Sequence, residues 1–366
     1  MESEETVLYY SLNQDQDWLA VGTTFGYRIY NLQNVKLISS YDNAGVAIIE
    51  MLYSTNLLAI VGADNNSVFS PKRLTIWNSN SSNSIWEISF PYKVTAVKIN
   101  KQRLITWIKD KIHIYDLNNT RILESIVVKN NQLGRLVLSP NYSENCYLVY
   151  TDSITNGIVK VYDTWNLRLA STFEAHQSPI LKMGINYVGN KLVTVSCKGT
   201  IIRVFLLPKG DKLFSFKRGL ANSMVYSLNF SRQGNYIILS SDTGTIHWFA
   251  IPQKEEAVEE ENSNAEDGDE FSGISVANNT DKECKVCSIT SWIQSLLPID
   301  YKELMISKKS DYRLTNGDLC YPNICCMDRE EKNIIMFMKK KEFKMFTLEN
   351  GKLFEDSEFQ SEFLNE

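Results

Sequence analysis

The stretch that decides the fold is residues 198–205, KGTIIRVF, which ends in Ile202, Arg203, Val204 and Phe205. Its last four residues run apolar, polar, apolar, aromatic, the alternation of a strand that ends on a bulky ring. The same pattern recurs elsewhere, with its ring at positions 30, 77, 115, 162, 249 and 346. From 30 to 249 these rings, with Phe205, lie about 38 to 47 residues apart, the period of four-stranded propeller blades. Seven copies predict an all-β fold, a seven-bladed β-propeller.

The two ends of the chain predict complete blades. Four strand-like runs open the chain at 7–12, 18–22, 26–32 and 35–41, and four more close it at 324–327, 333–338, 342–348 and 352–354. The ring is therefore expected to close without a strand borrowed from the other end. The gap between Phe249 and Phe346 is about twice the period. We expect one domain, 1–366, with a long insertion in blade six at 252–310.

This insertion has two halves of opposite character. The part 252–288 contains a tract, 254–270, with nine acidic residues, so disorder is expected and a solubilising spacer is the simpler interpretation. In the part 289–306, Ile289, Trp292, Ile293 and Leu296 fall at i, i+3, i+4 and i+7, followed by Leu297, a pattern typical of an amphipathic helix. Two hypotheses stay open for it: a membrane-interface segment with nearby lysines, or a segment packed over the propeller rim.

Composition excludes several classes of function. The net charge of -5 and a pI near 5.5 argue against a polybasic surface for nucleic acid, so any anion site must be local. No secretory leader pattern and no run of 18 apolar residues occur, and seven cysteines suit reduced thiols in the cytoplasm. Cys284 and Cys287 form a CxxC without a second pair, so we expect no metal. No catalytic or cofactor motif is found, and we expect no enzyme.

A local anion site is indicated around Phe216, Lys217, Arg218 and Gly219. Neighbouring residues of an extended chain point to opposite sides, so Lys217 and Arg218 would face different blades and serve two sites. Cations with hydroxyl donors are what a phosphate needs. The flanking segments supply Ser196, Thr200 and Arg203 before the dipeptide, and Ser240, Ser241, Thr245 and His247 after it. On spacing alone, an ordinary solvated pair at a strand end is the alternative.

At this point the chain resembles the PROPPIN family, whose signature Phe-Arg-Arg-Gly reads Phe216, Lys217, Arg218, Gly219 here. PROPPINs are seven-bladed, WD-repeat-like propellers that bind phosphoinositides in autophagy and endosomal membrane traffic. The resemblance covers nearly the whole folded chain. It rests on NQD at 13–15, VGT at 21–23, GYRI at 26–29, IEML at 49–52, VG at 61–62, PKRL at 71–74, IWN at 76–78, AH at 175–176, SP at 178–179 and the stretch 198–205.

The resemblance implies two head-group pockets at the rims of blades five and six, for phosphatidylinositol 3-phosphate and 3,5-bisphosphate. The first pocket would use His176, Ser178, Ser196, Thr200, Arg203 and Lys217. The second would use Arg218, Ser240, Ser241, Thr245 and His247. Lys217 departs from the signature, because lysine keeps the charge but loses the planar fork of arginine. The first pocket is therefore expected to be weaker or differently selective.

The resemblance also implies membrane insertion and a partner. Family members drive a long loop of blade six into the bilayer, which favours insertion by Trp292, Ile293, Leu296 and Leu297. Arg103, expected between blades two and three, would contact a coiled-coil scaffold of the ubiquitin-like lipidation machinery. An exposed cation beside a strand is the alternative for Arg103.

The expected protein is a peripheral effector on preautophagosomal, vacuolar and endosomal membranes that recruits autophagy or cytoplasm-to-vacuole transport machinery. It would need no cofactor and bind no nucleic acid. The competing hypothesis is a lipid-independent WD-repeat adaptor for protein interactions, in which the basic stretch is incidental.

Overall fold

The computed structural model describes residues 5–64, 68–128, 134–141, 146–252, 310–313, 322–338, 342–349 and 352–356. These ranges contain strands, turns and loops but no helix. The predicted all-β class is confirmed.

The described strands form seven antiparallel sheets, each built from four consecutive strands, which we number as blades one to seven in chain order. Blades one to four contain β1 Val7–Leu12, β2 Trp18–Thr23, β3 Tyr27–Asn31, β4 Lys36–Tyr41, β5 Val46–Met51, β6 Leu57–Gly62, β7 Arg73–Asn78, β8 Asn83–Ser89, β9 Val94–Ile99, β10 Arg103–Ile108, β11 Lys111–Asp116, β12 Ile122–Val127, β13 Leu136–Leu138, β14 Tyr147–Thr151, β15 Gly157–Asp163 and β16 Arg168–His176. Blades five to seven contain β17 Ile180–Ile185, β18 Lys191–Ser196, β19 Ile201–Leu206, β20 Asp211–Lys217, β21 Val225–Phe230, β22 Tyr236–Ser241, β23 Thr245–Ala250, β24 Ser310–Arg313, β25 Asn323–Met327, β26 Asn333–Met338, β27 Phe343–Glu349 and β28 Lys352–Glu355.

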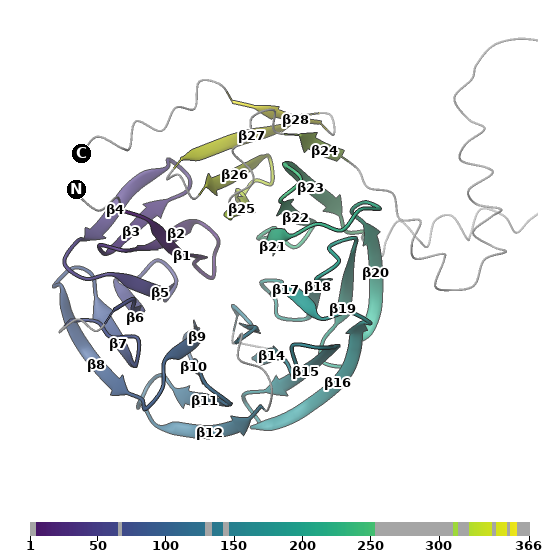
Figure 1. Ribbon diagram of the computed structural model, residues 1–366. Helices are drawn as coiled ribbons and strands as arrows, with labels where there is room; N and C mark the ends of the chain where they lie inside the picture. The colour runs from purple at the N-terminus through teal and green to yellow at the C-terminus, as the bar shows by residue number, and fades with distance from the viewer. Residues whose placement is uncertain are drawn as a thin grey trace, which may run out of the picture.

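The seven blades form a closed ring (Figure 1). The first strand of each blade lies nearest the ring axis and the fourth lies at the circumference. Blades one and seven lie side by side and share a hydrophobic cluster that includes Val21, Tyr30 and Phe337. Each of these two blades is complete in itself, so the prediction of closure without a borrowed strand is confirmed.

The long insertion falls in blade six, between its third and fourth strands. β23 pairs with β24 through Thr245 opposite Arg313 and Trp248 opposite Ser310, although residues 251–309 separate the two strands in the sequence. The acidic part predicted at 252–288 and the amphipathic part at 289–306, with Trp292, Ile293, Leu296 and Leu297, lie outside the described residues apart from position 252. Cys284 and Cys287 lie outside them too.

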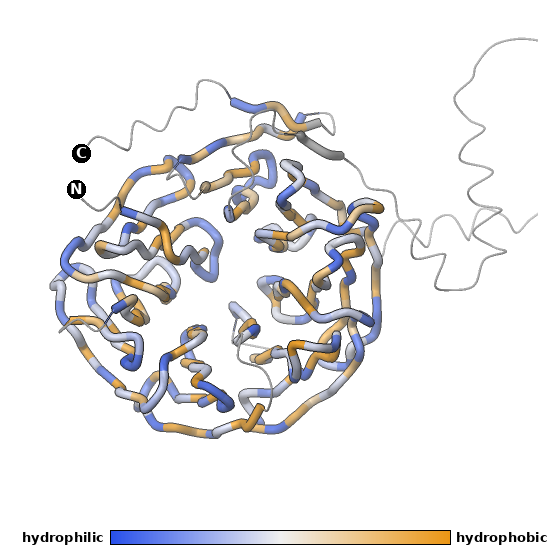
Figure 2. Tube along the Cα trace, viewed as in Figure 1, coloured by the Kyte–Doolittle hydropathy of each residue, from blue (hydrophilic) through white to orange (hydrophobic). Residues whose placement is uncertain are grey.

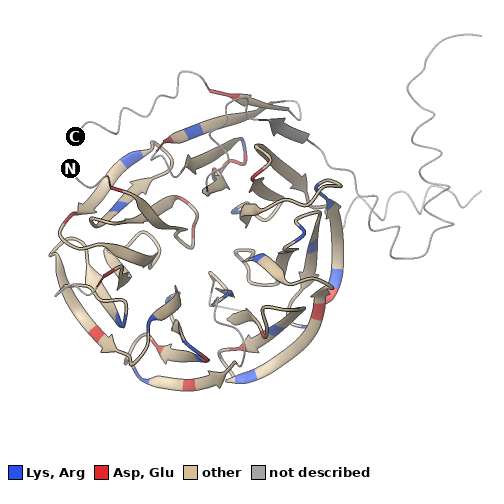
Figure 3. Cartoon of the chain, viewed as in Figure 1, with Lys and Arg blue, Asp and Glu red and all other residues tan. Residues whose placement is uncertain are grey.

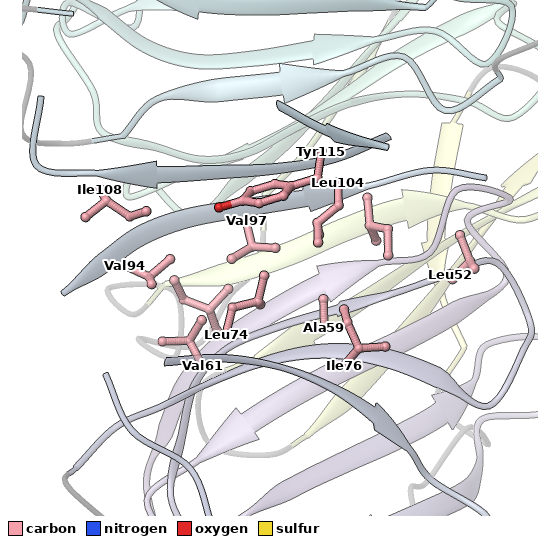
Figure 4. Close-up of a cluster of buried hydrophobic side chains, with 12 residues drawn as sticks. Leu52, Ala59, Val61, Leu74, Ile76, Val94, Val97, Leu104, Ile108 and Tyr115 are labelled. Atoms are coloured by element: carbon pink, nitrogen blue, oxygen red, sulfur yellow. The ribbon is translucent and has the colours of Figure 1, made fainter. Parts of the chain in front are cut away.

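The hydrophobic core is divided among the interfaces between neighbouring blades. Figure 4 shows the cluster between blades two and three, where Leu74 and Val97 meet Leu104. Hydrophobic residues occur in every blade of the ring (Figure 2). The repeated ring at the end of each third strand is buried throughout: Phe205 is 3% exposed and Phe346 is 0% exposed. Full burial of such a side chain contributes about 1.5–3 kcal/mol, which explains the aromatic repeat.

Candidate functional site

The predicted site residues of blades five and six gather at one end of their strands. In an antiparallel blade, the turn from second to third strand and the exit of the fourth strand lie at the same end. In blade five these are the turn 197–200 and the end of β20 at Lys217. In blade six the corresponding turn is 242–244. Figure 3 shows Lys and Arg scattered around the ring, so anion binding at this end depends on local groups.

Lys217 and Arg218 point to opposite sides of blade five, as predicted. Lys217 pairs with Ile201, and Ser215 pairs with Arg203, so the exposed Lys217 shares the face of Arg203. That face packs on blade four, because Phe205 lies in the cluster that joins blades four and five. Phe216 instead packs with Val225 and Phe249 of blade six. Arg218 follows on the blade-six side and is only 5% exposed.

The first cluster of site residues lies between blades four and five. His176 is buried at the end of β16, and its Nε2 lies 2.9 Å from the Thr194 hydroxyl. Arg203 donates from Nη1 to the Ala175 carbonyl at 2.6 Å. Burial, and then the charge of Arg203, lower the pKa of His176 to about 3, so its ring is neutral. The cluster therefore combines one fixed cation with one uncharged imidazole.

Arg203 also has a donor without a partner. Its Nε is buried and makes no hydrogen bond to the part of the chain that the structure describes. A buried donor left unsatisfied destabilises the protein by about 1–3 kcal/mol, so an anion or water there would be favoured. Ser196 is on the same face of blade five as Arg203, and Thr200 is in the turn between β18 and β19. Ser178 lies two residues beyond His176.

The second cluster faces blade five from blade six. The hydroxyls of Ser241, Thr243 and Thr245 are connected, with Ser241 to Thr243 at 2.8 Å and Thr243 to Thr245 at 2.9 Å. The Thr245 hydroxyl lies 2.8 Å from Nε2 of His247, which is 2% exposed. The His247 ring is nearly parallel to that of Phe249, at 12° and 6.4 Å between centroids. The result is a polar chain held on an aromatic base.

Arg218 lies beside this cluster and is tied to the backbone. Its Nε donates to the Gly199 carbonyl and its Nη2 donates to the Ala221 carbonyl at 2.6 Å. Burial lowers the pKa of the guanidinium from its ordinary value, against the opposing effect of Asp242. Arg218 therefore positions the chain around the site as well as supplying charge.

Ser240 is not brought into the second cluster. It is fully buried, and its hydroxyl donates to the side-chain carbonyl oxygen of Asn323 in blade seven. Ser240 and Ser241 are consecutive in β22, so they point to opposite faces of the blade. Only Ser241 faces Thr245 and His247.

Arg103 lies elsewhere than expected. It begins β10 in blade three, and it reaches toward blade four, not blade two. Its Nε donates to the Thr164 carbonyl at 3.1 Å, and its guanidinium lies 5.2 Å from the centre of the Trp165 ring. At 7% exposure it is not an exposed cation beside a strand, whereas Trp165 is 44% exposed. The buried guanidinium of Arg103 thus lies against the exposed aromatic ring of Trp165.

Three residues that contribute to the clusters were not predicted: Thr194, Thr243 and Asp242. Thr194 precedes Ser196 by two positions and so shares its face, and this spacing was a usable signal. Thr243 lies in the hydroxyl-rich turn between Ser241 and Thr245. Asp242 accepts a hydrogen bond from the Ser223 hydroxyl at 2.6 Å, a contact that only the fold brings about.

The inner strands line a cavity of about 400 Å³ near the ring axis, to which Tyr9, Lys98 and Lys182 contribute. No residue of either cluster lines it. Within the described ranges, no group of three or more His, Cys, Asp or Glu side chains is placed to hold a metal ion. The same ranges contain no helix long and apolar enough to cross a bilayer.

Comparison with known proteins identifies relatives over most of the chain. The PROPPIN family model matches residues 6–278. Autophagy-related protein 18 of Dictyostelium discoideum is 40% identical over 247 residues, which are 68% of this chain and 66% of that protein. WD repeat domain phosphoinositide-interacting protein 2 of Gallus gallus is 38% identical over 261 residues, 70% of this chain and 58% of that protein. The chain thus matches about 58–66% of the length of these two curated relatives.

Solved structures share the fold. Kluyveromyces lactis Hsv2 superposes with a TM-score of 0.73 at 20% identity and covers 97% of this chain and 98% of its own. A complex of KlAtg21 with the coiled-coil of AgAtg16 gives a TM-score of 0.72 at 18% identity, over 96% of this chain and 98% of that one. At these identities the likeness establishes the propeller alone.

Proposed function

The chain belongs to the PROPPIN family, and from that premise we propose that it binds phosphoinositide head groups at blades five and six. Bound there, it recruits autophagy or cytoplasm-to-vacuole transport machinery to preautophagosomal, vacuolar and endosomal membranes. The names of its relatives, an autophagy-related protein and a phosphoinositide-interacting protein, support this proposal.

One observation carries the proposal: Lys217 and Arg218 extend to opposite sides of blade five, each toward its own cluster of donors. The first cluster has a neutral His176 and an Arg203 with a buried unmatched donor. The second joins three hydroxyls to His247 beside Arg218. The ionised oxygens of a phosphate accept hydrogen bonds, and charge-assisted donors bind them best. We assign phosphatidylinositol 3-phosphate and phosphatidylinositol 3,5-bisphosphate as ligands.

The two sites should differ in strength. Lys217 is exposed, and its ammonium is a point charge without the two-pronged geometry of arginine. Arg218 keeps that geometry and is fixed by two backbone contacts. Substitution of Arg218 should therefore weaken membrane binding more than substitution of Lys217.

A third contact comes from the amphipathic segment 289–306, for which we propose membrane insertion through Trp292, Ile293, Leu296 and Leu297. Two weak head-group sites and one apolar segment on the same chain act through effective concentration. Such a combination gives reversible binding to a marked membrane, because loss of the phosphate mark removes most of the avidity.

For the protein partner we propose a coiled-coil scaffold of the ubiquitin-like lipidation machinery, bound at Arg103 and the exposed Trp165. KlAtg21, which has the same fold, forms a complex with the coiled-coil of AgAtg16. An acidic coiled coil would extend the guanidinium's contacts beyond Trp165. A pull-down with Arg103→Glu that retains full scaffold binding would remove this part of the proposal.

The lipid proposal is tested by flotation with liposomes that contain phosphatidylinositol 3-phosphate, the 3,5-bisphosphate, or phosphatidylserine at matched charge. Wild type is compared with Lys217→Ala, Arg218→Ala and the double variant. Lys111→Ala is the matched control, because Lys111 is an exposed lysine in blade three. Phosphoinositide-selective flotation that the double variant loses and the control keeps is expected. If the protein floats with none of the lipids, or floats equally well with phosphatidylserine, the lipid assignment fails and the lipid-independent adaptor takes its place.

A further inference from the structure

The connection between blades five and six has an unusual apolar tip. This loop, residues 219–224, joins β20 to β21 between the two clusters. Leu220 is 86% exposed, the highest value among the large hydrophobic side chains of the described residues. Met224, at the other end of the loop, is 52% exposed. Single exposed apolar residues are common on soluble proteins, so exposure alone assigns no function.

The loop is fixed to the turn of blade five, which argues against a loosely placed tip. The Arg218 amide donates to the Thr200 carbonyl at 2.8 Å, and the Ser223 amide donates to the Lys198 carbonyl at 3.1 Å. Arg218 Nη2 closes the loop from inside by bonding the Ala221 carbonyl at 2.6 Å. The backbone on both sides of Leu220 is therefore held.

The loop is also fixed to the turn of blade six. The Ser223 hydroxyl donates to Asp242 at 2.6 Å, and the Asp242 amide donates to the Met224 carbonyl at 3.0 Å. Leu220 thus stands on a short support that joins the turns of both proposed head-group sites. This loop is already ordered in the folded protein, so binding through its tip would cost little additional conformational entropy.

The charge around the loop suits an anionic membrane surface. Two exposed lysines flank the loop: Lys198 lies in the turn whose carbonyl accepts from Ser223, and Lys217 ends β20 just before the loop begins. Asp242 is the acidic group at its base, and it lies beside Arg218 and accepts from Ser223. An exposed aliphatic tip with lysines at its base is the arrangement of a segment that enters the interface between head groups and acyl chains.

We propose that the loop 219–224 is a second membrane anchor, which inserts Leu220, with Met224 at its edge, into the bilayer between the two head-group sites. This proposal rests on the phosphoinositide binding proposed above and is separate from insertion by the segment 289–306. The partner of this loop is a lipid bilayer. Leu220 would contact its acyl chains, which a soluble head group lacks.

The test separates vesicle binding from head-group binding. Wild type, Leu220→Ser and Ile122→Ser are titrated with phosphatidylcholine vesicles that contain phosphatidylinositol 3-phosphate, and with the water-soluble dibutanoyl form of the same lipid. Ile122, 57% exposed in blade three, is the matched control because it lies away from both sites. Leu220→Ser should lose roughly tenfold in vesicle affinity, as expected for one aliphatic side chain withdrawn from hydrocarbon. Its affinity for the soluble lipid should equal that of wild type.

The outcomes are distinct. Vesicle affinity of Leu220→Ser equal to that of wild type, with phosphoinositide dependence intact, overturns the anchor and leaves the proposed function standing. An equal loss in Ile122→Ser also overturns it, since the effect would then be general. Wild type that ignores the phosphoinositide overturns both proposals. In a second measurement, Leu220→Trp should show more quenching by lipids with brominated acyl chains than wild type does, and no increase would contradict insertion.

Discussion

Arg218→Ala should destabilise the fold as well as weaken anion binding. The side chain is 5% exposed and donates to the carbonyls of Gly199 and Ala221, so its removal deletes two charge-assisted hydrogen bonds. Hydrogen bonds of charged groups contribute about 1.5–3 kcal/mol each. Water that enters the vacated space will recover part of this. We expect a loss of about 2–4 kcal/mol in the free energy of unfolding.

The measurement is equilibrium urea unfolding followed by circular dichroism, without lipid. Lys217→Ala is the matched control, because it removes one neighbouring cation that is exposed, and it should change stability by less than about 0.5 kcal/mol. Arg218→Lys should fall between the two, since a lysine can reach one carbonyl but not both. If Arg218→Ala unfolds at the same urea concentration as Lys217→Ala, the two backbone contacts contribute nothing and Arg218 acts through charge alone.

Three further changes test other parts of the structure. The His176 pKa is lowered to about 3 from its ordinary 6.5, so between these pH values the unfolded chain binds more protons and the fold loses stability as pH falls. His176→Gln should lessen that loss in urea unfolding measured across this pH range, and an equal slope of unfolding free energy against pH in wild type and variant would contradict burial of a neutral ring. Gly199 and Gly234 both have positive φ, 65° and 82°, but only at Gly199 would a Cβ lie 2.0 Å from the Ser223 carbonyl, so Gly199→Ala should lower stability and vesicle affinity clearly more than Gly234→Ala, and similar losses would refute the close approach. Leu104→Ala, in the core between blades two and three, should lower the free energy of unfolding by about 2–5 kcal/mol, and a loss under about 1 kcal/mol would mean that this interface is loosely packed.

The ring was predictable because its determinants are local. Each blade repeats an alternation that ends on a buried aromatic side chain, and every strand end in both terminal blades was predicted to within one residue. The opposite orientation of Lys217 and Arg218 followed from the same alternation. Applied to Ser240 and Ser241, that rule would also have separated them, since neighbouring strand residues cannot share a face.

Contacts between blades were not predictable from spacing. The Arg103 side chain is positioned by the Thr164 carbonyl and lies over the ring of the next residue, Trp165. The direction of the Arg103 side chain therefore depends on how blade four packs against blade three. The contact of Ser223 with Asp242 is made within blade six, where the pairing of β21 with β22 brings the loop before β21 beside the turn after β22. Sequence patterns fix which face of a strand a residue occupies. They do not fix which neighbour across the interface it meets.

The position of Arg103 relative to the two clusters bears on how the proposed contacts combine. Arg103 begins a second strand, β10, whereas Ser196 and Ser241 end the second strands β18 and β22. Corresponding strands run in the same sense around the ring, so Arg103 and the clusters lie at opposite faces, separated by one six-residue strand, or about 20 Å. A bilayer at the clusters would therefore leave Trp165 accessible. Scaffold and membrane should then bind without competition: adding scaffold should leave the vesicle affinity of the propeller equal or higher, and mutual displacement in a flotation assay would refute this division of the two faces.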